Sequence, residues 1–254
     1  MTAMLDFFLP PEMSTFVFVV LLVISFVASF ITVAFGIGGG ALMLAVMATL
    51  VPPLALIPTH GVIQWGSNFG RMVLTWRHIF WRAVPGFLVG SIIGAGLGSL
   101  LVVNIPPALV QIAVACFILW SLLGKPFTAI RNWPVTVGAV SSFLTMFFGA
   151  TGMFVATYTK SQALGRHAHV ATHATLMTAQ HGIKSVAFGI IGFAFGAWAP
   201  FIVAMIVLGF AGTVAGKLLL NRMPDARFRR ALDLVLLLLS LRLLYGGVTQ
   251  LIWG

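Results

Sequence analysis

Long apolar runs, separated by short breaks of glycine, proline and basic residues, make up nearly the whole chain. Ten such stretches are separable, and we expect each to be helical. Their approximate bounds are 14–35, 41–57, 59–75, 83–103, 106–124, 133–148, 152–165, 170–194, 197–220 and 228–248. A full membrane span needs about 20 helical residues, and the second and seventh stretches are shorter than that before they are broken. The sequence therefore predicts eight to ten membrane segments, with these two as half-helices or re-entrant segments.

A polar motif occurs twice within these apolar runs. It reads PTHGVIQWGSNFGR from Pro58 and ATHATLMTAQHGIK from Ala171, and the copies align without a gap at an interval of 113 residues. The same interval places Phe35 on Phe148. The aligned polar pairs are Thr59 with Thr172, His60 with His173, Asn68 with His181 and Arg71 with Lys184. Two matches in one register indicate an internal repeat.

The loop charges predict that the two copies have opposite orientations in the membrane. Five stretches per copy is an odd number, so the second copy enters from the other side. Basic residues follow the third stretch but not its counterpart, the eighth, and they follow the ninth but not its counterpart, the fourth. The positive-inside rule gives inverted repeats this alternation. We therefore expect an all-α integral membrane protein with two inverted-topology repeats, 1–125 and 126–254, and broken or half-helices at the repeat interface.

Composition supports a membrane protein and indicates its orientation. With 60% hydrophobic and 7% charged residues and a mean hydropathy of +1.11, the chain lacks the polar residues needed to cover a globule in water. The net charge of +10 lies mainly in short loops, which indicates topology rather than nucleic-acid binding. Cytoplasmic placement of these loops puts twelve of the fourteen Lys and Arg residues inside, all except Lys184 and Arg242. Both termini are then outside. The single cysteine, Cys116, excludes a disulfide framework and a thiolate metal cage.

Two glycine-rich breaks lie at matching positions of the repeats, GIGGG from Gly36 and GATGM from Gly149. Glycine permits an unwound backbone, and the half-helix that follows begins with unpaired N–H groups and a positive dipole end, which suits an anion. Close helix packing is the alternative use of such small residues. Recurrence of the position favours a binding site, for which the candidate residues are Gly38, Gly39, Gly40, Thr151 and Gly152.

Each copy of the polar motif predicts a polar stripe on a helix. Helical spacing puts Gln64, Asn68 and Arg71 on the face of His60, and we expect the second copy to present an equivalent stripe. Antiparallel packing would bring His60 level with Lys184 and His173 level with Arg71, with Asn68 and His181 between them. Polar groups inside a membrane usually face a pathway. The predicted substrate-binding residues of the stripes are Thr59, His60, Gln64, Asn68, Arg71, Thr172, His173, Gln180, His181 and Lys184.

Structural roles are the alternative for several of these polar residues. A Thr or His in a membrane helix often makes only an interhelical hydrogen bond, and Arg71 can serve as a cytoplasmic anchor. Of the four acidic residues only Asp233 lies in an apolar stretch, where Arg229 or Arg230 can pair with it. No carboxylate is then left to hold a cation at mid-membrane. We expect Arg242 to extend to the membrane surface.

The segment FGIGGGALMLAVMATLVPPLALIPTHGV, a following Trp/Arg-rich loop and the looser repeats FGATGMFVATY and ATHATL resemble the sulfite exporter TauE/SafE family. The resemblance extends from about Val17 to Tyr245. It implies a transporter in the bacterial inner membrane that exports a small sulfur-containing anion such as sulfite, sulfoacetate or a related organosulfonate. The implied partners are this anion, the lipid bilayer and, as an alternative to a monomer, a second copy in a homodimer. No nucleic acid, cofactor or resident metal is expected.

Two other function classes agree less well with the sequence. A cation or transition-metal transporter would use His60, His173 and His181, but such sites usually add a carboxylate or cysteine, and the stripe has neither. An enzyme is not expected, because the chain has no paired carboxylates and no G-x-S-x-G or H-E-x-x-H motif. Moving one charge through 100 mV is worth about 2.3 kcal/mol. We therefore expect potential-driven anion export, with histidine protonation tuning affinity.

Overall fold

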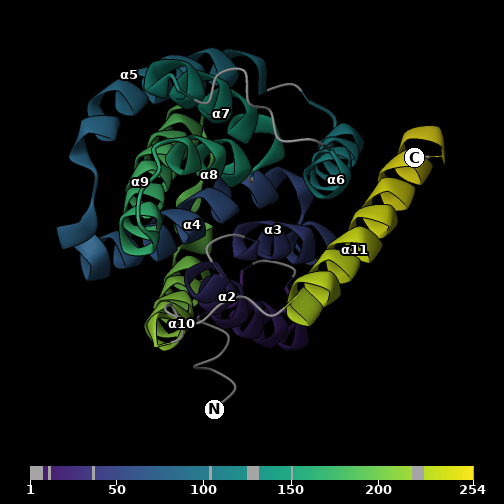
Figure 1. The fold of residues 1–254 in the computed structure, drawn as a ribbon. Helices are drawn as coiled ribbons and strands as arrows, with labels where there is room; N and C mark the ends of the chain where they lie inside the picture. Colours follow the sequence, from purple (N-terminus) through teal and green to yellow (C-terminus); the bar gives the residue numbers. More distant parts are fainter. Residues whose placement is uncertain are drawn as a thin grey trace.

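A computed structural model describes residues 8–10, 13–35, 38–102, 105–124, 132–149, 151–218 and 226–253. Within these ranges the chain forms ten α-helices and three short 3₁₀ turns, with no strand, so the predicted all-α class is confirmed there (Figure 1). The helices are α2 (Thr15–Phe35), α3 (Gly39–Leu50), α4 (Pro53–Thr75), α5 (Val84–Val102), α6 (Pro107–Leu123), α7 (Pro134–Phe148), α8 (Gly152–Ser161), α9 (Arg166–Ile190), α10 (Ala199–Lys217) and α11 (Ala226–Trp253). The 3₁₀ turns are η1 (Trp76–His78), η2 (Trp81–Ala83) and η3 (Phe195–Trp198).

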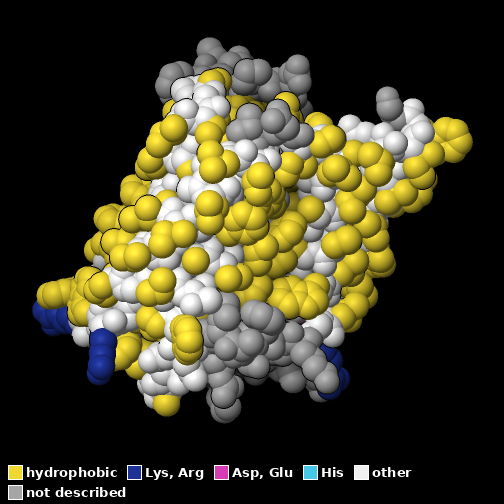
Figure 2. Space-filling view, turned by 90° about the horizontal axis from the view of Figure 1, so that it is seen from above, with side chains coloured by type: hydrophobic (Ala, Val, Ile, Leu, Met, Phe, Trp, Pro, Cys, Tyr) yellow, Lys and Arg dark blue, Asp and Glu magenta, His cyan; other side chains and the backbone are white. Residues whose placement is uncertain are grey.

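Four of the described segments are long and apolar enough to cross a membrane: Thr15–Ala34, Trp81–Val102, Phe195–Lys217 and Leu232–Trp253. Apolar side chains cover their outer surfaces, as in α5, where Leu100 is 76% exposed. Figure 2 shows hydrophobic side chains over the middle of the molecule, with the visible Lys and Arg side chains at one end. Such a surface suits a multi-pass membrane protein.

Each of the ten predicted apolar stretches contains one of these helices, but one predicted boundary is wrong. The break between the second and third stretches was expected at residue 58 and lies at Val51 and Pro52. Pro53 takes the first position of α4, where its missing N–H removes no helical hydrogen bond, and α4 then continues through Pro58. The 12 residues of α3 and the 10 of α8 are about 18 and 15 Å long. Neither helix can cross a hydrocarbon core of about 30 Å.

Helix boundaries recur at the 113-residue interval. Helix α2 ends at Phe35 and α7 at Phe148, whereas α3 begins at Gly39 and α8 at Gly152. Helices α4 and α9 also begin 113 residues apart. The segments on both sides of the two breaks therefore have the same order and similar lengths.

The helices pair between the first and second parts of the chain. Helix α5 packs along α7, α2 packs along α10, and α4 faces α9. Figure 1 places the first two pairs on opposite sides of the molecule, with α4 and α9 between them. A Cβ added at Gly94 of α5 would overlap the backbone carbonyl of Ala139, and one added at Gly212 of α10 would overlap that of Phe26. Both outer pairs are thus in backbone contact, which small residues permit.

Several basic residues gather at one end of the bundle. Lys217, at the end of α10, donates from Nζ to the carbonyl oxygen of Leu74 at 3.1 Å. Arg166, at the start of α9, donates to the carbonyl oxygen of Ala34 near the end of α2 at 3.0 Å. The turns that follow α4, with two more arginines, are at this same end, which we call the basic end. Three further basic residues of the predicted cytoplasmic loops lie outside the described residues: Lys125, Arg131 and Arg222.

Candidate functional site

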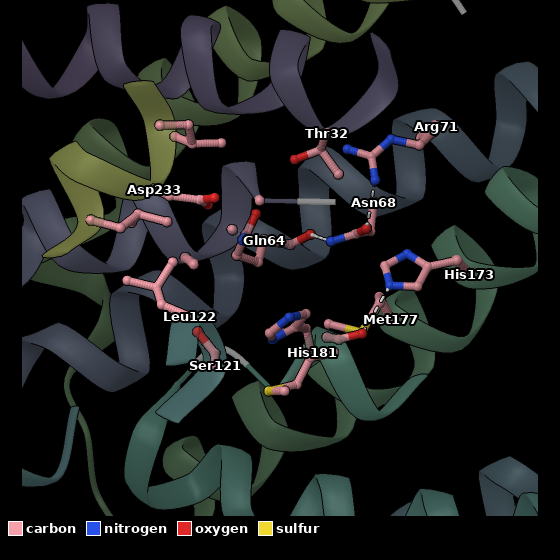
Figure 3. A pocket seen from close by; sticks show the side chains of 17 residues that line it. Thr32, Gln64, Asn68, Arg71, Ser121, Leu122, His173, Met177, His181 and Asp233 are labelled. Carbon is pink, nitrogen blue, oxygen red and sulfur yellow. Dashed lines mark hydrogen bonds between the residues drawn. The ribbon is translucent and has the colours of Figure 1, made fainter. Parts of the chain in front are cut away.

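A cavity of about 190 Å³ lies between the two parts of the chain, among α4, α9 and the starts of the short helices α3 and α8 (Figure 3). Its polar side chains come mainly from α4 and α9, which face each other. The lining includes eight of the residues predicted from the sequence: Gly38, Gly40, Gln64, Asn68, Arg71, Gly152, His173 and His181. These residues come from both predicted repeats, so the cavity depends on both.

Arg71 is the cation of this cavity. Its side chain is only 2% exposed, and Nη1 donates a hydrogen bond of 3.1 Å to Oδ1 of Asn68. The Nδ2 of Asn68 donates in turn to the carbonyl oxygen of Gln64 at 2.7 Å. The Nε of Arg71 is buried without a hydrogen-bond partner, and no ion pair to Arg71 is recorded in the described part of the chain. A buried cation without a counter-charge is unfavourable, so this position suits an anionic ligand.

The starts of the two short helices also face the cavity. Gly38, directly before α3, has a φ of 106°, in the left-handed region that glycine adopts without strain. Gly40 and Gly152 lie in the first turns of α3 and α8 and line the cavity. First-turn N–H groups have no partner within a helix, and the dipole is positive there. Two helix starts and one guanidinium thus make the cavity electropositive.

Equivalent histidines connect the two short helices to the two long ones. Nε2 of His60 lies 3.4 Å from the carbonyl oxygen of Gly40, and Nε2 of His173 lies 3.2 Å from that of Gly152. Since a carbonyl only accepts, both Nε2 atoms are the donors. His60 and His173 therefore fix α4 to α3 and α9 to α8 in the same manner.

A second basic cluster lies beside the cavity and consists of His60, His181 and Lys184. The rings of His60 and His181 are 6.0 Å apart between centroids. Nζ of Lys184 donates to the carbonyl oxygen of Gly149 at 3.4 Å, and the side chain is fully buried. A Cβ added at Gly61 would lie 2.7 Å from Cε of Lys184, so His60 and Lys184 are level, as expected. His181 belongs with His60, however, and not midway between the two histidine–cation pairs.

Four predicted residues have other contacts and do not line the cavity. Gln180 accepts a hydrogen bond from Ser141 through Oε1 and donates to Thr151 through Nε2, both at 2.7 Å. Thr59 donates to the carbonyl oxygen of Ala55 within its own helix at 2.6 Å. Thr172 accepts a 2.9 Å hydrogen bond from the backbone N–H of Phe80. These threonines and the glutamine hold helices and turns together.

Gly39 also has a packing role. A Cβ added there would overlap the backbone carbonyl of Ala28 on α2. The glycine therefore permits the close approach of α3 to α2 and leaves its neighbours Gly38 and Gly40 to face the cavity.

A comparison with known families identifies the chain. The model of the sulfite exporter TauE/SafE family matches residues 21–243. The chain belongs to the TauE/SafE family. This is a family of transporters, and membership confirms both the predicted resemblance and the prediction that the protein is not an enzyme. No curated protein and no solved structure gives a significant match to this TauE/SafE chain.

The structure adds residues to the TauE/SafE cavity that sequence reasoning missed. Thr32 of α2, Ser121 of α6 and Asp233 of α11 contribute to its lining. Asp233 was expected to pair with an arginine of its own helix, but no ion pair with Arg230 is recorded in the described residues. Its position as the lone acidic residue in an apolar stretch was the available signal. Arg242 lies exposed on α11, as expected for a residue that extends to the membrane surface.

No three His, Cys, Asp or Glu side chains converge in the portion of this TauE/SafE chain that the structure describes. The second basic cluster supplies two imidazoles and a lysine. Transition-metal sites usually require more imidazole, thiolate or carboxylate ligands than this. The cluster is therefore poorly suited to a metal ion.

Proposed function

We propose that the protein exports a small sulfur-containing anion, such as sulfite, sulfoacetate or a related organosulfonate, across the bacterial inner membrane. The observation that carries this proposal is the buried Arg71 guanidinium, which has no counter-charge and faces a cavity between two helix starts. An oxyanion placed there gains charge-assisted hydrogen bonds from Arg71 and from unpaired N–H groups. Membership in the TauE/SafE family supports this class of substrate.

The two halves of the chain, 1–125 and 126–254, are proposed to be inverted repeats of five helical segments each. Recurrence of helix boundaries at one interval supports this. So does the exchange of partners, because α5 packs on α7 whereas its counterpart α10 packs on α2, the counterpart of α7. Transporters with such repeats commonly bind substrate at discontinuous helices between them.

Export is proposed because the cavity approaches the basic end. Its lining includes Ser121 at the end of α6 and Asp233 near the start of α11, and Gly38 follows α2 close to the carbonyl that Arg166 binds. Basic loops favour the cytoplasmic side. The cavity therefore receives its anion from the cytoplasm, and both termini are placed in the periplasm.

The membrane potential is the proposed energy source. A cell interior that is negative by 100 mV drives out a monoanion with about 2.3 kcal/mol and a dianion with twice that. Protonation of His60, His173 or His181 would tune affinity and not act as an obligatory proton carrier. Anion efflux from proteoliposomes under an imposed potential, without a pH gradient, tests this. Efflux that ignores the potential, follows a proton gradient and stops when all three histidines are replaced would overturn it.

Transport of labelled sulfite, compared with Zn²⁺, tests the substrate class in the same proteoliposomes. We expect sulfite flux that Arg71→Gln reduces by about tenfold or more, because charge-assisted hydrogen bonds are lost. Arg77→Gln is the matched control, since it removes an exposed charge outside the cavity. Zn²⁺ flux without sulfite flux would favour the transition-metal alternative. A homodimer stays a prediction, which the mass of the purified protein in detergent would test.

A further inference from the structure

The second basic cluster contains more hydrogen-bonding capacity than its surroundings use. Both ring nitrogens of His181 and Nδ1 of His60 are buried without a hydrogen-bond partner. The ammonium of Lys184 has three donors and one recorded contact, the 3.4 Å hydrogen bond to Gly149. Buried polar groups are normally satisfied. A small oxyanion would satisfy this cluster, because His181 and Lys184 can both donate to it.

Lys184 and Arg71 are counterparts in the internal repeat. They lie 113 residues apart on the facing helices α4 and α9, and both are buried. Arg71 lines the open cavity, whereas Lys184 does not. His181 lines this cavity and also contacts the ring of His60, so it connects the two positions.

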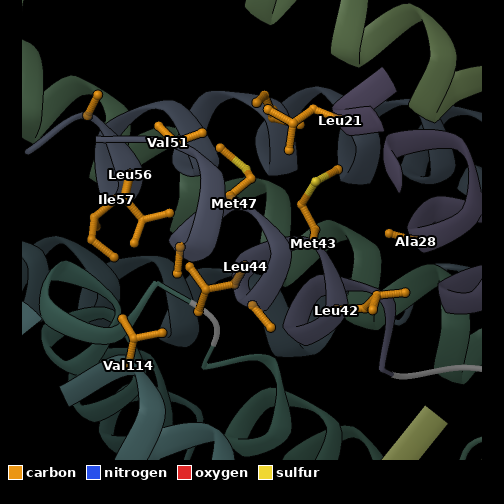
Figure 4. Close-up of a cluster of buried hydrophobic side chains, with 14 of the residues drawn as sticks. Leu21, Ala28, Leu42, Met43, Leu44, Met47, Val51, Leu56, Ile57 and Val114 are labelled. Carbon is orange, nitrogen blue, oxygen red and sulfur yellow. The ribbon is translucent and has the colours of Figure 1, made fainter. Parts of the chain in front are cut away.

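Apolar side chains separate the cluster from a second cavity of about 480 Å³. A Cβ added at Gly149 would lie 2.8 Å from Cδ1 of Leu44 and 3.1 Å from Cδ1 of Ile57. Figure 4 shows both side chains within the buried apolar core. Ile57 also lines the second cavity, together with Phe148 and Phe188, which is one turn beyond Lys184 on α9. The basic cluster thus lies between two cavities, and the contact around Gly149 closes it on one side.

We propose that His60, His181 and Lys184 form a second anion position, which takes the anion from Arg71 and releases it at the end of the bundle opposite the basic end. This inference rests on the proposed anion export. In the present conformation the second position is closed. Separation of Leu44 and Ile57 from Gly149 opens it toward the second cavity.

Half-saturation measured separately from each membrane face tests the assignment, with labelled sulfite as the probe. Exchange into right-side-out vesicles reports the outer face, and uptake by inside-out vesicles reports the cytoplasmic face. We expect Lys184→Gln to raise the outer value about tenfold and to change the cytoplasmic value by less than about twofold, with the reverse for Arg71→Gln. Lys184→Arg, which keeps the charge, should restore the outer value. Equal shifts on both faces, or no shift with Lys184→Gln, would overturn the proposal.

Thiol accessibility provides a readout that does not depend on transport. In a Cys116→Ala background, a membrane-impermeant thiol reagent should label His60→Cys from the outer face and its counterpart His173→Cys from the cytoplasmic face. A cysteine at position 60 that reacts from neither face, or only from the cytoplasmic face, contradicts the second position. If the parent vesicles exchange no sulfite, the proposed function fails, whereas this labelling still decides whether the cluster opens outward.

Discussion

Arg71 donates a 3.1 Å hydrogen bond to the side-chain oxygen of Asn68, one turn before it on α4. The amide keeps the guanidinium in the cavity without neutralising it. Asn68→Asp would place a carboxylate at the same distance, so the cation would be paired and anion affinity should fall. We expect half-saturation for sulfite in inside-out vesicles to rise about tenfold or more, compared with a smaller rise for Asn68→Ala. Parent-like uptake by Asn68→Asp would mean that Arg71 does not bind the anion.

His181→Ala is expected to weaken transport more than its effect on folding can explain. The imidazole lines the cavity, and neither of its nitrogens has a hydrogen-bond partner, so its removal breaks no internal bond. We expect the melting temperature to stay close to that of the parent while sulfite flux falls several-fold. If His181→Ala and Asn68→Ala both bind and transport like the parent, the polar stripe serves packing alone.

Gln64→Ala and Gln180→Ala should have opposite signatures. Gln64 lines the cavity, whereas Gln180 is fully buried and is hydrogen-bonded to Ser141 and Thr151. Removing the Gln180 amide leaves buried polar partners unsatisfied, which costs on the order of 1–3 kcal/mol. We expect Gln180→Ala to lower thermal stability with unchanged half-saturation, and Gln64→Ala to do the reverse. Detergent melting curves and vesicle uptake separate the two, and equal effects on affinity would contradict the assignment.

Gly38→Ala should impair both stability and transport. Its φ of 106° costs an alanine on the order of 1–2 kcal/mol, and the new methyl would lie 3.0 Å from Cδ2 of Leu232 at the cavity. Gly192→Ala is the matched control, because Gly192 has a φ of 99° and nothing within 4 Å of an added Cβ. Both variants should melt earlier, and only Gly38→Ala should reduce sulfite flux. Equal flux in the two variants would separate the Gly38 backbone from binding.

Membrane topology is checked by reporter fusions. If the basic end faces the cytoplasm, a fusion at Gly254 should be active only with a periplasmic reporter, because the loop charges leave both termini outside. A fusion in the turns after α4, near Arg77, should be active only with a cytoplasmic one. Cytoplasmic activity at Gly254 would reverse the proposed orientation and, with it, the direction of transport.

Hydrophobic periodicity predicted the helices well because apolar runs broken by glycine and proline leave few other structures for a membrane. It misplaced the start of α4 because Pro58 reads as a helix breaker, although Pro53 had already started the helix at a position that tolerates proline. Glycine breaks at equivalent positions likewise predicted where α3 and α8 begin.

The candidate site was predicted less completely than the fold. Spacing arguments placed Gln180 and His181 on one face, but neighbours on a helix point about 100° apart. His181 consequently faces the cavity while Gln180 faces α7. Asp233 and Thr32 could not be assigned to the cavity from periodicity, because their position depends on how α11 and α2 pack against the rest of the bundle.

The backbone contact between α5 and α7 has a consequence for synthesis. When the ribosome has completed α5, its glycine face, including Gly94, has no protein partner, since the helix that covers it is still to be translated. Helix α2 waits longer, because α10 follows near the end of the chain. The early helices must therefore remain in lipid with their contact faces open. A truncated first half, released after α6, would lack the partners of both α2 and α5.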